Sequence, residues 1–157
     1  MPTGFDELCR GCAVLASYHA VGSEADPSLL SRSAETAGLT ICFPYIVNHH
    51  EPLRFLIDDG RAPQTGPFGL RQPPADAPPA LPDIVLVPLL GFDRALQRIG
   101  QGAGHYDRAL AALPRALRVG VALSAQEVPA IPVDPWDQPL DAIVTEAGLI
   151  RNSGARA

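Results

Sequence analysis

The chain has 157 residues, a length that fits one domain with its own hydrophobic core. Hydrophobic residues make up 46% and charged residues 18%, which excludes an intrinsically disordered chain. The formal net charge is −5, so bulk electrostatic attraction to nucleic acid or to an acidic membrane is not expected.

The N-terminus and the cysteines give no sign of export. Residues 1–8 carry two acidic side chains where a signal peptide has basic ones, and no apolar run approaches the roughly 20 residues that cross a bilayer. Cys9 and Cys12 form a C-x-x-C, but the sequence offers no second pair of zinc ligands and no βαβ context for a redox motif. Together with Cys42 they predict reduced thiols in a cytoplasmic protein.

The first half of the chain predicts three strands and one helix. Asp26 and Pro27 are typical of a helix start, because the carboxylate caps free N–H groups and proline fits the first helical position. The helix is expected over residues 27–37, with three apolar side chains facing inward. These are Leu29, Leu30 and Ala34. Short apolar runs predict strands at 12–18, 39–44 and 53–57, the last compatible with a hairpin.

Turns and a stiff connection separate these elements. His49 and His50 lie in a polar turn, and neighbouring residues on an extended chain point in opposite directions, which favours a solvated turn over a metal site. The acidic residues of 58–60 are best explained as turn formers. Residues 64–81 are loop-like, and the five prolines within 73–82 predict a stiff surface connection, because they are too dense for a helix or a central strand.

The second half predicts three more strands and one helix. A buried strand over 83–88 precedes a glycine-rich loop, and the helix-forming run after that loop ends near residue 113. Further strands are expected at 117–123 and 141–145, and residues 151–157 are expected to fray. This alternation predicts a single-domain α/β fold, a three-layer sandwich with a mostly parallel or mixed central sheet. Ligands of such sheets gather beyond the carboxyl ends of the strands.

The residues best suited to binding or catalysis surround three alternating glycines, Gly100, Gly102 and Gly104. A backbone without Cβ atoms can approach a ligand closely, and its successive N–H groups can converge on an anion. Arg98 and Arg108 bracket the loop and offer positive charge for a phosphate. The loop therefore suggests a phosphate site.

Asp107 offers the hard oxygen that Mg²⁺ prefers beside a phosphate, which favours the functional interpretation of this stretch. A purely structural interpretation is equally compatible with the residues alone. In the alternative, the glycines form a flexible turn, Tyr106 lies in the core and Asp107 makes a salt bridge. The glycine spacing matches neither the Walker P-loop nor the dinucleotide-binding pattern.

The stretch Arg98–Arg108, preceded by Phe92 and Asp93, resembles the signature of the 5-formyltetrahydrofolate cyclo-ligase family, also called methenyltetrahydrofolate synthetases. Shorter matches follow the family order over about residues 13–150. They are Tyr18 with Glu24 and Asp26, Phe43-Pro44, Gly69 to Pro73, Gln126, Pro132, Asp137 and Thr145-Glu146.

The resemblance implies ATP- and Mg²⁺-dependent conversion of the small molecule 5-formyltetrahydrofolate to 5,10-methenyltetrahydrofolate, without a nucleic-acid or membrane partner. The formyl oxygen is phosphorylated by ATP, N10 attacks the activated carbon, and phosphate leaves. The implied ATP-binding residues are Arg98, Gly100, Gln101, Gly102, Ala103, Gly104, His105, Tyr106, Asp107 and Arg108.

The resemblance also implies individual roles. Arg98 and Tyr106 would stabilise and position the reacting groups, and Asp107, the third catalytic residue, would hold Mg²⁺. Glu24, Phe68 and Tyr106 would contact the folate. Trp136 is open to two interpretations, stacking on the pterin or covering the core.

Four departures from the family pattern bear on activity. Leu96 stands where the family usually has glycine, His105 where it usually has tyrosine, and Gln72 where it usually has glutamate. The family also begins with a basic helix, which this chain starts too late to contain, so turnover is expected to be slow. The alternative function is a degenerate paralogue that binds nucleotide or folate without catalysis. An RNA-associated domain of this fold is disfavoured by the negative charge.

Overall fold

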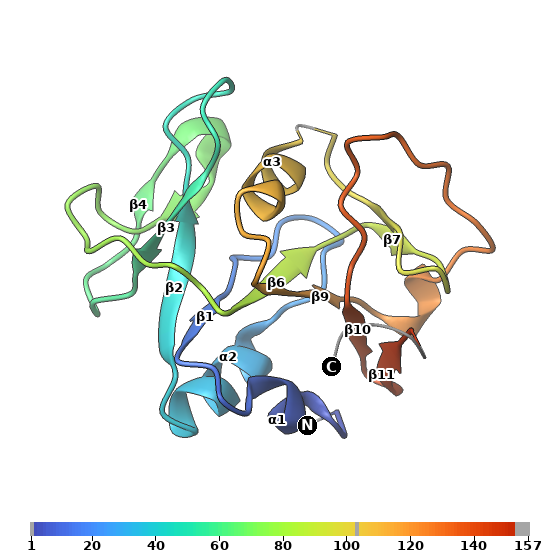
Figure 1. Ribbon diagram of the computed structural model, residues 1–157. Helices are drawn as coiled ribbons and strands as arrows, with labels where there is room; N and C mark the ends of the chain where they lie inside the picture. The colour runs from blue at the N-terminus through green and yellow to red at the C-terminus, as the bar shows by residue number, and fades with distance from the viewer. Residues whose placement is uncertain (1, 103, 153–157) are drawn as a thin grey trace.

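In the computed structural model, which describes residues 2–102 and 104–152, seven strands form one central sheet (Figure 1). In order across the sheet they are β11 (Gly148–Arg151), β10 (Ala142–Thr145), β9 (Leu117–Val121), β6 (Ile84–Pro88), β1 (Val14–Ala16), β2 (Thr40–Tyr45) and β3 (Arg54–Ile57). The inner five are parallel, and the edge strands β11 and β3 run antiparallel to their neighbours. The predicted mixed α/β sheet is confirmed.

Strand β6 shows why the sheet is covered on both faces. Its residues are apolar without interruption, as expected of a parallel strand buried on both sides. Because side chains alternate along a strand, Ile84 and Leu86 join one hydrophobic cluster, whereas Val85 and Val87 join the other. The sheet therefore separates two cores.

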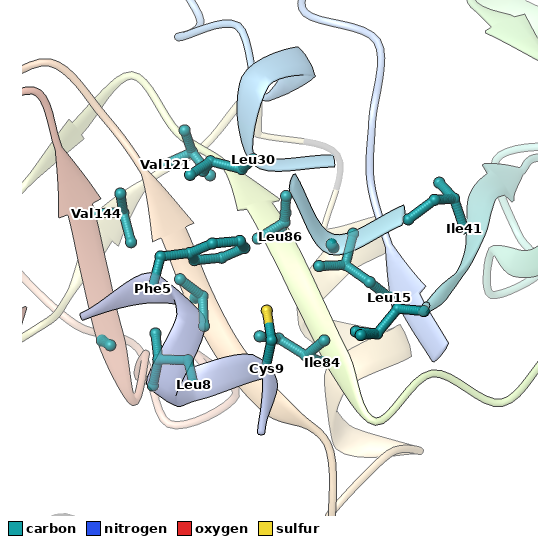
Figure 2. Packing of buried hydrophobic residues seen from close by; sticks show 14 of the residues in the cluster. Phe5, Leu8, Cys9, Leu15, Leu30, Ile41, Ile84, Leu86, Val121 and Val144 are labelled. Atoms are coloured by element: carbon teal, nitrogen blue, oxygen red, sulfur yellow. The ribbon is translucent and has the colours of Figure 1, made fainter. Parts of the chain in front are cut away.

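Helices occupy both of these faces and complete three layers (Figure 1). Helices α1 (Phe5–Cys9) and α2 (Ser28–Thr36) pack on one face, and α3 (His105–Ala111) packs on the other. Figure 2 shows Phe5 of α1 lying between Val144 and Leu86 of the sheet. The sequence predicted no helix at α1, because five residues are too few to show a helical period.

Helix α2 begins close to its predicted position. The N–H of Ser28 donates to Oδ1 of Asp26 at 2.9 Å, so the carboxylate satisfies a free donor at the helix start. The N-cap position itself is Pro27, one residue later than predicted. Leu30 and Ala34 are buried four residues apart on one helix face. The inward prediction for Leu29 is wrong: its side chain is 73% exposed, because one residue along the helix turns about 100° away from that face.

The loop-like residues 64–81 and the segment between β6 and the glycines each contain short strands. Residues 64–81 include the ladder of β4 (Gln64–Thr65) and β5 (Arg71–Gln72), joined by a 3₁₀ turn over Pro67–Gly69. The segment before the glycines forms a hairpin of β7 (Gly91–Phe92) and β8 (Arg98–Ile99). Such two-residue strands are too short to produce an alternating sequence pattern.

The structure adds detail to the proline-rich segment and corrects the predicted C-terminal tail. The proline-rich segment 73–82 runs along the edge strand β3, where the N–H of Ile57 donates to the Pro78 carbonyl at 2.8 Å and that of Ala80 to the Phe55 carbonyl at 2.9 Å. The prediction that residues 151–157 fray is wrong for Arg151, which belongs to β11 and pairs with Ala142 of β10. Residues 153–157 lie outside the described residues. No helix in the described part of the chain is long and apolar enough to cross a membrane.

Leu96 occupies a conformation that favours glycine. Its φ is 65°, and its side chain is fully buried in the core beneath α3. Its N–H donates to the Asp93 carbonyl, and its carbonyl accepts from the N–H of Leu140, both at 3.0 Å. A left-handed backbone costs a non-glycine residue about 1–2 kcal/mol, so the leucine offsets strain by filling the core.

Leu96→Ala is expected to lower the free energy of unfolding by about 2–5 kcal/mol, and Leu96→Gly to be no less stable than Leu96→Ala. The equally buried Leu110 lies inside helix α3, where glycine is about 1 kcal/mol worse than alanine. Urea denaturation of the four variants tests the contrast. A glycine variant less stable than the alanine variant at both positions would remove the strain argument.

Candidate functional site

A cavity of about 540 Å³ opens at the carboxyl ends of the parallel strands. Tyr18 follows β1, Ile46 follows β2 and Pro88 ends β6, and all three line it. Strand β1 lies between β2 and β6, so the order of the strands reverses there, which is the usual place for a ligand in such a sheet. The other walls come from the glycine loop, the first turn of α3, residues 68–72 and the segment 134–138.

Arg98 and Asp107 form an ion pair in this cavity. Nη2 of Arg98 donates to Oδ1 of Asp107 at 3.2 Å, and the same oxygen accepts from the N–H of Gln138 at 3.2 Å. The Arg98 side chain is only 9% exposed, and its Nε is buried without a hydrogen-bond partner among the described residues. A buried guanidinium with an unsatisfied donor is a natural contact for an anion.

The glycine loop is shaped by the arginine beside it. A Cβ on Gly100 would lie 2.5 Å from Nη1 of Arg98, so any other residue would displace the guanidinium. Gly102 and Gly104 have φ of 89° and 71°, conformations that side chains disfavour. Gly100, Gly102 and Gly104 line the cavity as predicted, and Ala103 lies outside the described residues.

Helix α3 starts earlier than predicted, directly after Gly104. His105, Tyr106 and Asp107 therefore belong to its first turn, and all three line the cavity. Arg108 does not line it: its Nη2 donates to the carbonyl of His49 at 3.2 Å. The predicted phosphate contact of Arg108 gains no support from this position.

Tyr106 lies beside the ion pair. The guanidinium carbon of Arg98 is 6.0 Å from the centre of the Tyr106 ring. Burial raises the pKa of the Tyr106 hydroxyl well above its ordinary value, and the charge of Glu24 raises it further. The hydroxyl is therefore protonated at neutral pH and can donate a hydrogen bond to an oxygen of a ligand.

Glu24 connects the loop after β1 to the glycine loop. Its Oε2 accepts from the N–H of Val21 at 2.9 Å, and its Oε1 accepts from Nε2 of Gln101 at 3.3 Å. Gln126, one of the matches to the family order, does not line the cavity, and its Nε2 donates to the carbonyl of Ser23 at 3.2 Å. The structure thus brings Glu24 and Gln101 together at the cavity and gives Gln126 a supporting position.

Aromatic rings form a second wall of the cavity. The Phe68 ring centre lies 4.1 Å from that of His49 and 6.2 Å from that of His105. Phe68 has φ of 65° and is half exposed, a strained and poorly covered position for a large apolar residue. Burial lowers the pKa of His105, and the charges of Arg108 and His49 lower it further.

Gln72 and Trp136 are two further lining residues with distinct positions. Oε1 of Gln72 accepts from the N–H of Ile46 at 3.0 Å, and its Nε2 donates to the Ile46 carbonyl at 3.4 Å, so the amide clamps the end of β2. Trp136 is 66% exposed, which excludes the interpretation that it covers the core, and its stacking on a ligand stays a prediction.

Sequence reasoning assigned no role to Asp137, which lines the cavity next to the residue whose N–H binds Asp107. Its Oδ2 accepts from the N–H of Asp134 at 2.8 Å. The signal available in the sequence was its match to the family order. Within the described ranges no three or more His, Cys, Asp or Glu side chains gather as a metal site. Asp107 and Asp137 both line the cavity, one from α3 and the other from the segment that contacts α3 through Gln138.

The cysteines do not contribute to the cavity. Cys9 and Cys42 are buried free thiols, and burial raises the pKa of Cys9 to about 11 and that of Cys42 to about 12. Sγ of Cys12 donates to the Leu8 carbonyl. Because thiolates are the reactive form, these raised pKa values favour the predicted inert thiols.

The sequence model of the 5-formyltetrahydrofolate cyclo-ligase family matches residues 7–146. The 5-formyltetrahydrofolate cyclo-ligase of Mycolicibacterium smegmatis is 32% identical over 143 residues, covering 83% of this chain and 72% of that protein. The Escherichia coli K12 cyclo-ligase is 39% identical over 82 residues, covering 48% of this chain and 45% of that protein. The chain thus spans about half the length of the E. coli relative.

Solved structures agree on the fold. The 5,10-methenyltetrahydrofolate synthetase of Aquifex aeolicus superimposes with a TM-score of 0.78 at 26% identity, covering 98% of this chain and 78% of that one. A 5,10-methenyltetrahydrofolate synthetase from Mycoplasma pneumoniae gives a TM-score of 0.67 at 22% identity, covering 88% and 80%. The second likeness is evidence for the fold alone.

Proposed function

Because the chain belongs to the 5-formyltetrahydrofolate cyclo-ligase family, we propose that it converts 5-formyltetrahydrofolate and ATP to 5,10-methenyltetrahydrofolate, ADP and phosphate. The formyl oxygen takes the γ-phosphoryl group, N10 attacks the formyl carbon, and the oxygen leaves with the phosphate. The N10 proton is lost as the methenyl bridge forms. These steps depend on positioning and on stabilisation of charge, and they need no protein nucleophile.

The observation that carries this proposal is the buried Arg98 guanidinium. It lines the cavity, it is oriented by Asp107, and its Nε has no partner among the described residues. A phosphate oxygen would supply that partner and would accept a charge-assisted hydrogen bond. The backbone at Gly100, Gly102 and Gly104 would approach the same phosphate from the loop, with Gln101 between them.

Mg²⁺ fits the carboxylates that line this end of the cavity. Asp107 and Asp137 come from α3 and from the segment that contacts it through Gln138. One or two carboxylates, completed by phosphate oxygens and water, are the usual ligands of Mg²⁺ in phosphoryl-transfer sites. The bound ion would neutralise charge on the transferring phosphoryl group. Asp107 would serve two purposes, as a metal ligand and as the group that orients Arg98.

The folate would occupy the wall formed by Phe68. That ring is half exposed at the cavity and is available for stacking on a flat heterocycle. Tyr106 would donate its hydroxyl proton to the formyl or phosphoryl oxygen. Glu24 lines the cavity between the two ligand regions, and its bond to Gln101 links the folate loop to the phosphate loop.

Two of the departures from the family pattern have structural explanations. Leu96 is enclosed in the core, and the Gln72 amide bonds to the backbone of Ile46. Neither position gives a reason for lost turnover, which favours an enzyme over the non-catalytic paralogue. The three free thiols support a reducing, cytoplasmic setting.

The direct test is the absorbance of methenyltetrahydrofolate formed by purified chain with 5-formyltetrahydrofolate, ATP and Mg²⁺. We expect formation that requires all three, with ADP released in equal amount. Calorimetric titration with each ligand accompanies the assay. Tight binding of both ligands without product would replace this proposal by the binding paralogue, and binding of neither would remove both functions.

A further inference from the structure

Trp136 presents a poorly covered indole to the cavity. It is the only tryptophan of the chain, it lines the cavity and it is 66% exposed. Within residues 2–102 and 104–152 the indole has no hydrogen-bond partner and no partner ring. Tryptophan side chains are highly buried on average, and a bare indole in a cavity wall is suited to stacking on a flat ring of a ligand.

The first turn of α3 divides the cavity into two flanks. Successive helical residues point about 100° apart, so His105 and Asp107 face directions about 200° apart, with Tyr106 between them. On the flank of His105 lies Phe68, with the two ring centres 6.2 Å apart. This is the flank that the proposed function gives to the folate.

Trp136 belongs to the opposite flank. The N–H of Gln138 donates to Oδ1 of Asp107, the oxygen that also accepts from Nη2 of Arg98. The side-chain amide of Gln138 in turn donates to the carbonyl of Trp136 at 3.5 Å. In the view of Figure 1, α3 lies between the 3₁₀ turn beside β4, which carries Phe68, and the long loop before β10, which carries Trp136. The indole is therefore tied to the arginine that the proposed function gives to phosphate.

We propose that the Trp136 indole stacks on the base of the bound nucleotide. This inference rests on the proposed function. The formyl group is attached to the pterin itself, so a pterin on the Phe68 flank meets the γ-phosphoryl group near Tyr106. The other phosphates and the nucleoside then extend from Arg98 along the opposite flank, where the indole is exposed. Stacking on an aromatic side chain uses the face of the base and needs no hydrogen bond to its edge.

The test removes the indole and compares ligands with and without a base. Trp136→Ala deletes the ring, and Trp136→Phe keeps a smaller flat one. Val133→Ala is the control, because Val133 is also exposed, lies three residues before Trp136 and does not line the cavity. Dissociation constants are measured by calorimetry for a non-hydrolysable ATP analogue, for inorganic tripolyphosphate and for 5-formyltetrahydrofolate.

Trp136→Ala is expected to weaken binding of the ATP analogue about tenfold, the usual size of a lost base-stacking contact. Affinities for tripolyphosphate, which has no base, and for the folate should change less than about twofold. Trp136→Phe should recover most of the loss, and Val133→Ala should have no effect. Phe68→Ala should show the reverse pattern, with a loss for the folate only.

Tryptophan fluorescence gives a second readout that does not depend on a variant. Because the chain has one tryptophan, its emission reports on position 136 alone. The ATP analogue should quench or shift the emission of the parent, with the dissociation constant found by calorimetry. Tripolyphosphate should leave the emission unchanged.

Three results would overturn the inference. They are equal affinity of Trp136→Ala and the parent for the ATP analogue, an equal loss for tripolyphosphate, and a loss confined to the folate, which would put the pterin on the indole. In each case the parent still forms product, so the proposed function survives. A parent that binds neither the ATP analogue nor the folate would instead fail the proposed function, and this inference with it.

Discussion

Replacing Arg98 by glutamine is expected to lower turnover about 100- to 1,000-fold, the usual cost of removing one preorganised donor from a developing negative charge. The guanidinium is buried and is held by Asp107, and its Nε has no hydrogen-bond partner within residues 2–102 and 104–152. Affinity for the ATP analogue should fall as well. Affinity for 5-formyltetrahydrofolate should stay within a few-fold of the parent, because the folate wall is formed by other residues.

The same hairpin supplies a matched control. Arg94 pairs with Glu127 at 2.7 Å, but its side chain is 69% exposed, and exposed ion pairs contribute little to stability. Arg94→Gln should therefore keep full turnover. Steady-state kinetics on both variants, with a urea denaturation curve for each, separates chemistry from folding. Equal activity of Arg98→Gln and the parent would remove Arg98 from the mechanism.

Asp107→Asn is expected to lower turnover by about 100-fold or more while leaving folate affinity nearly unchanged. The amide keeps the shape and can still accept from Gln138, but it removes the charge that orients Arg98 and that would bind Mg²⁺. Because both effects act on the phosphoryl group, the variant should also need more Mg²⁺ to reach half-maximal rate.

A double variant tests whether the two residues act as a unit. Groups that share one interaction are non-additive, so Asp107→Asn should cost much less in a chain that already carries Arg98→Gln. Asp134→Asn, combined with Arg98→Gln in the same way, is the control for additivity. Asp134 lines the same cavity, and no hydrogen bond joins it to Arg98 among the described residues. Strictly additive losses would show that Asp107 does not act through the arginine.

Much of the fold could be predicted from short-range pattern. Strand β6 is the clearest case, because it is apolar throughout and is covered on both faces. The short elements α1, β7 and β8 could not be predicted, because a few residues carry no period. Their place is set by the surfaces they meet, such as the sheet beneath Phe5.

Most of the predicted phosphate stretch lines the cavity, whereas Arg108 at its end does not, and its binding of phosphate stays a prediction. Arg98 and Asp107 are close in sequence, and the family signature pointed to both. Arg108 is one residue further along the helix, so it turns away from the cavity and reaches the carbonyl of His49. Only the start of α3 at His105 decides which of these side chains face the ligand.

The sequence by itself determined the α/β class, the family and the glycine loop, because these depend on residue type and spacing along the chain. The tertiary structure alone decided what completes the site. It brought Glu24 to Gln101 across 77 positions of sequence, and Phe68 to His105. It also placed Asp137 in the cavity, next to Gln138, whose N–H donates to Asp107. It also left Nε2 of His105 buried with no hydrogen-bond partner in the part of the chain that the structure describes. Such contacts depend on how loops from different strands meet at one edge of the sheet, and no local pattern encodes that meeting.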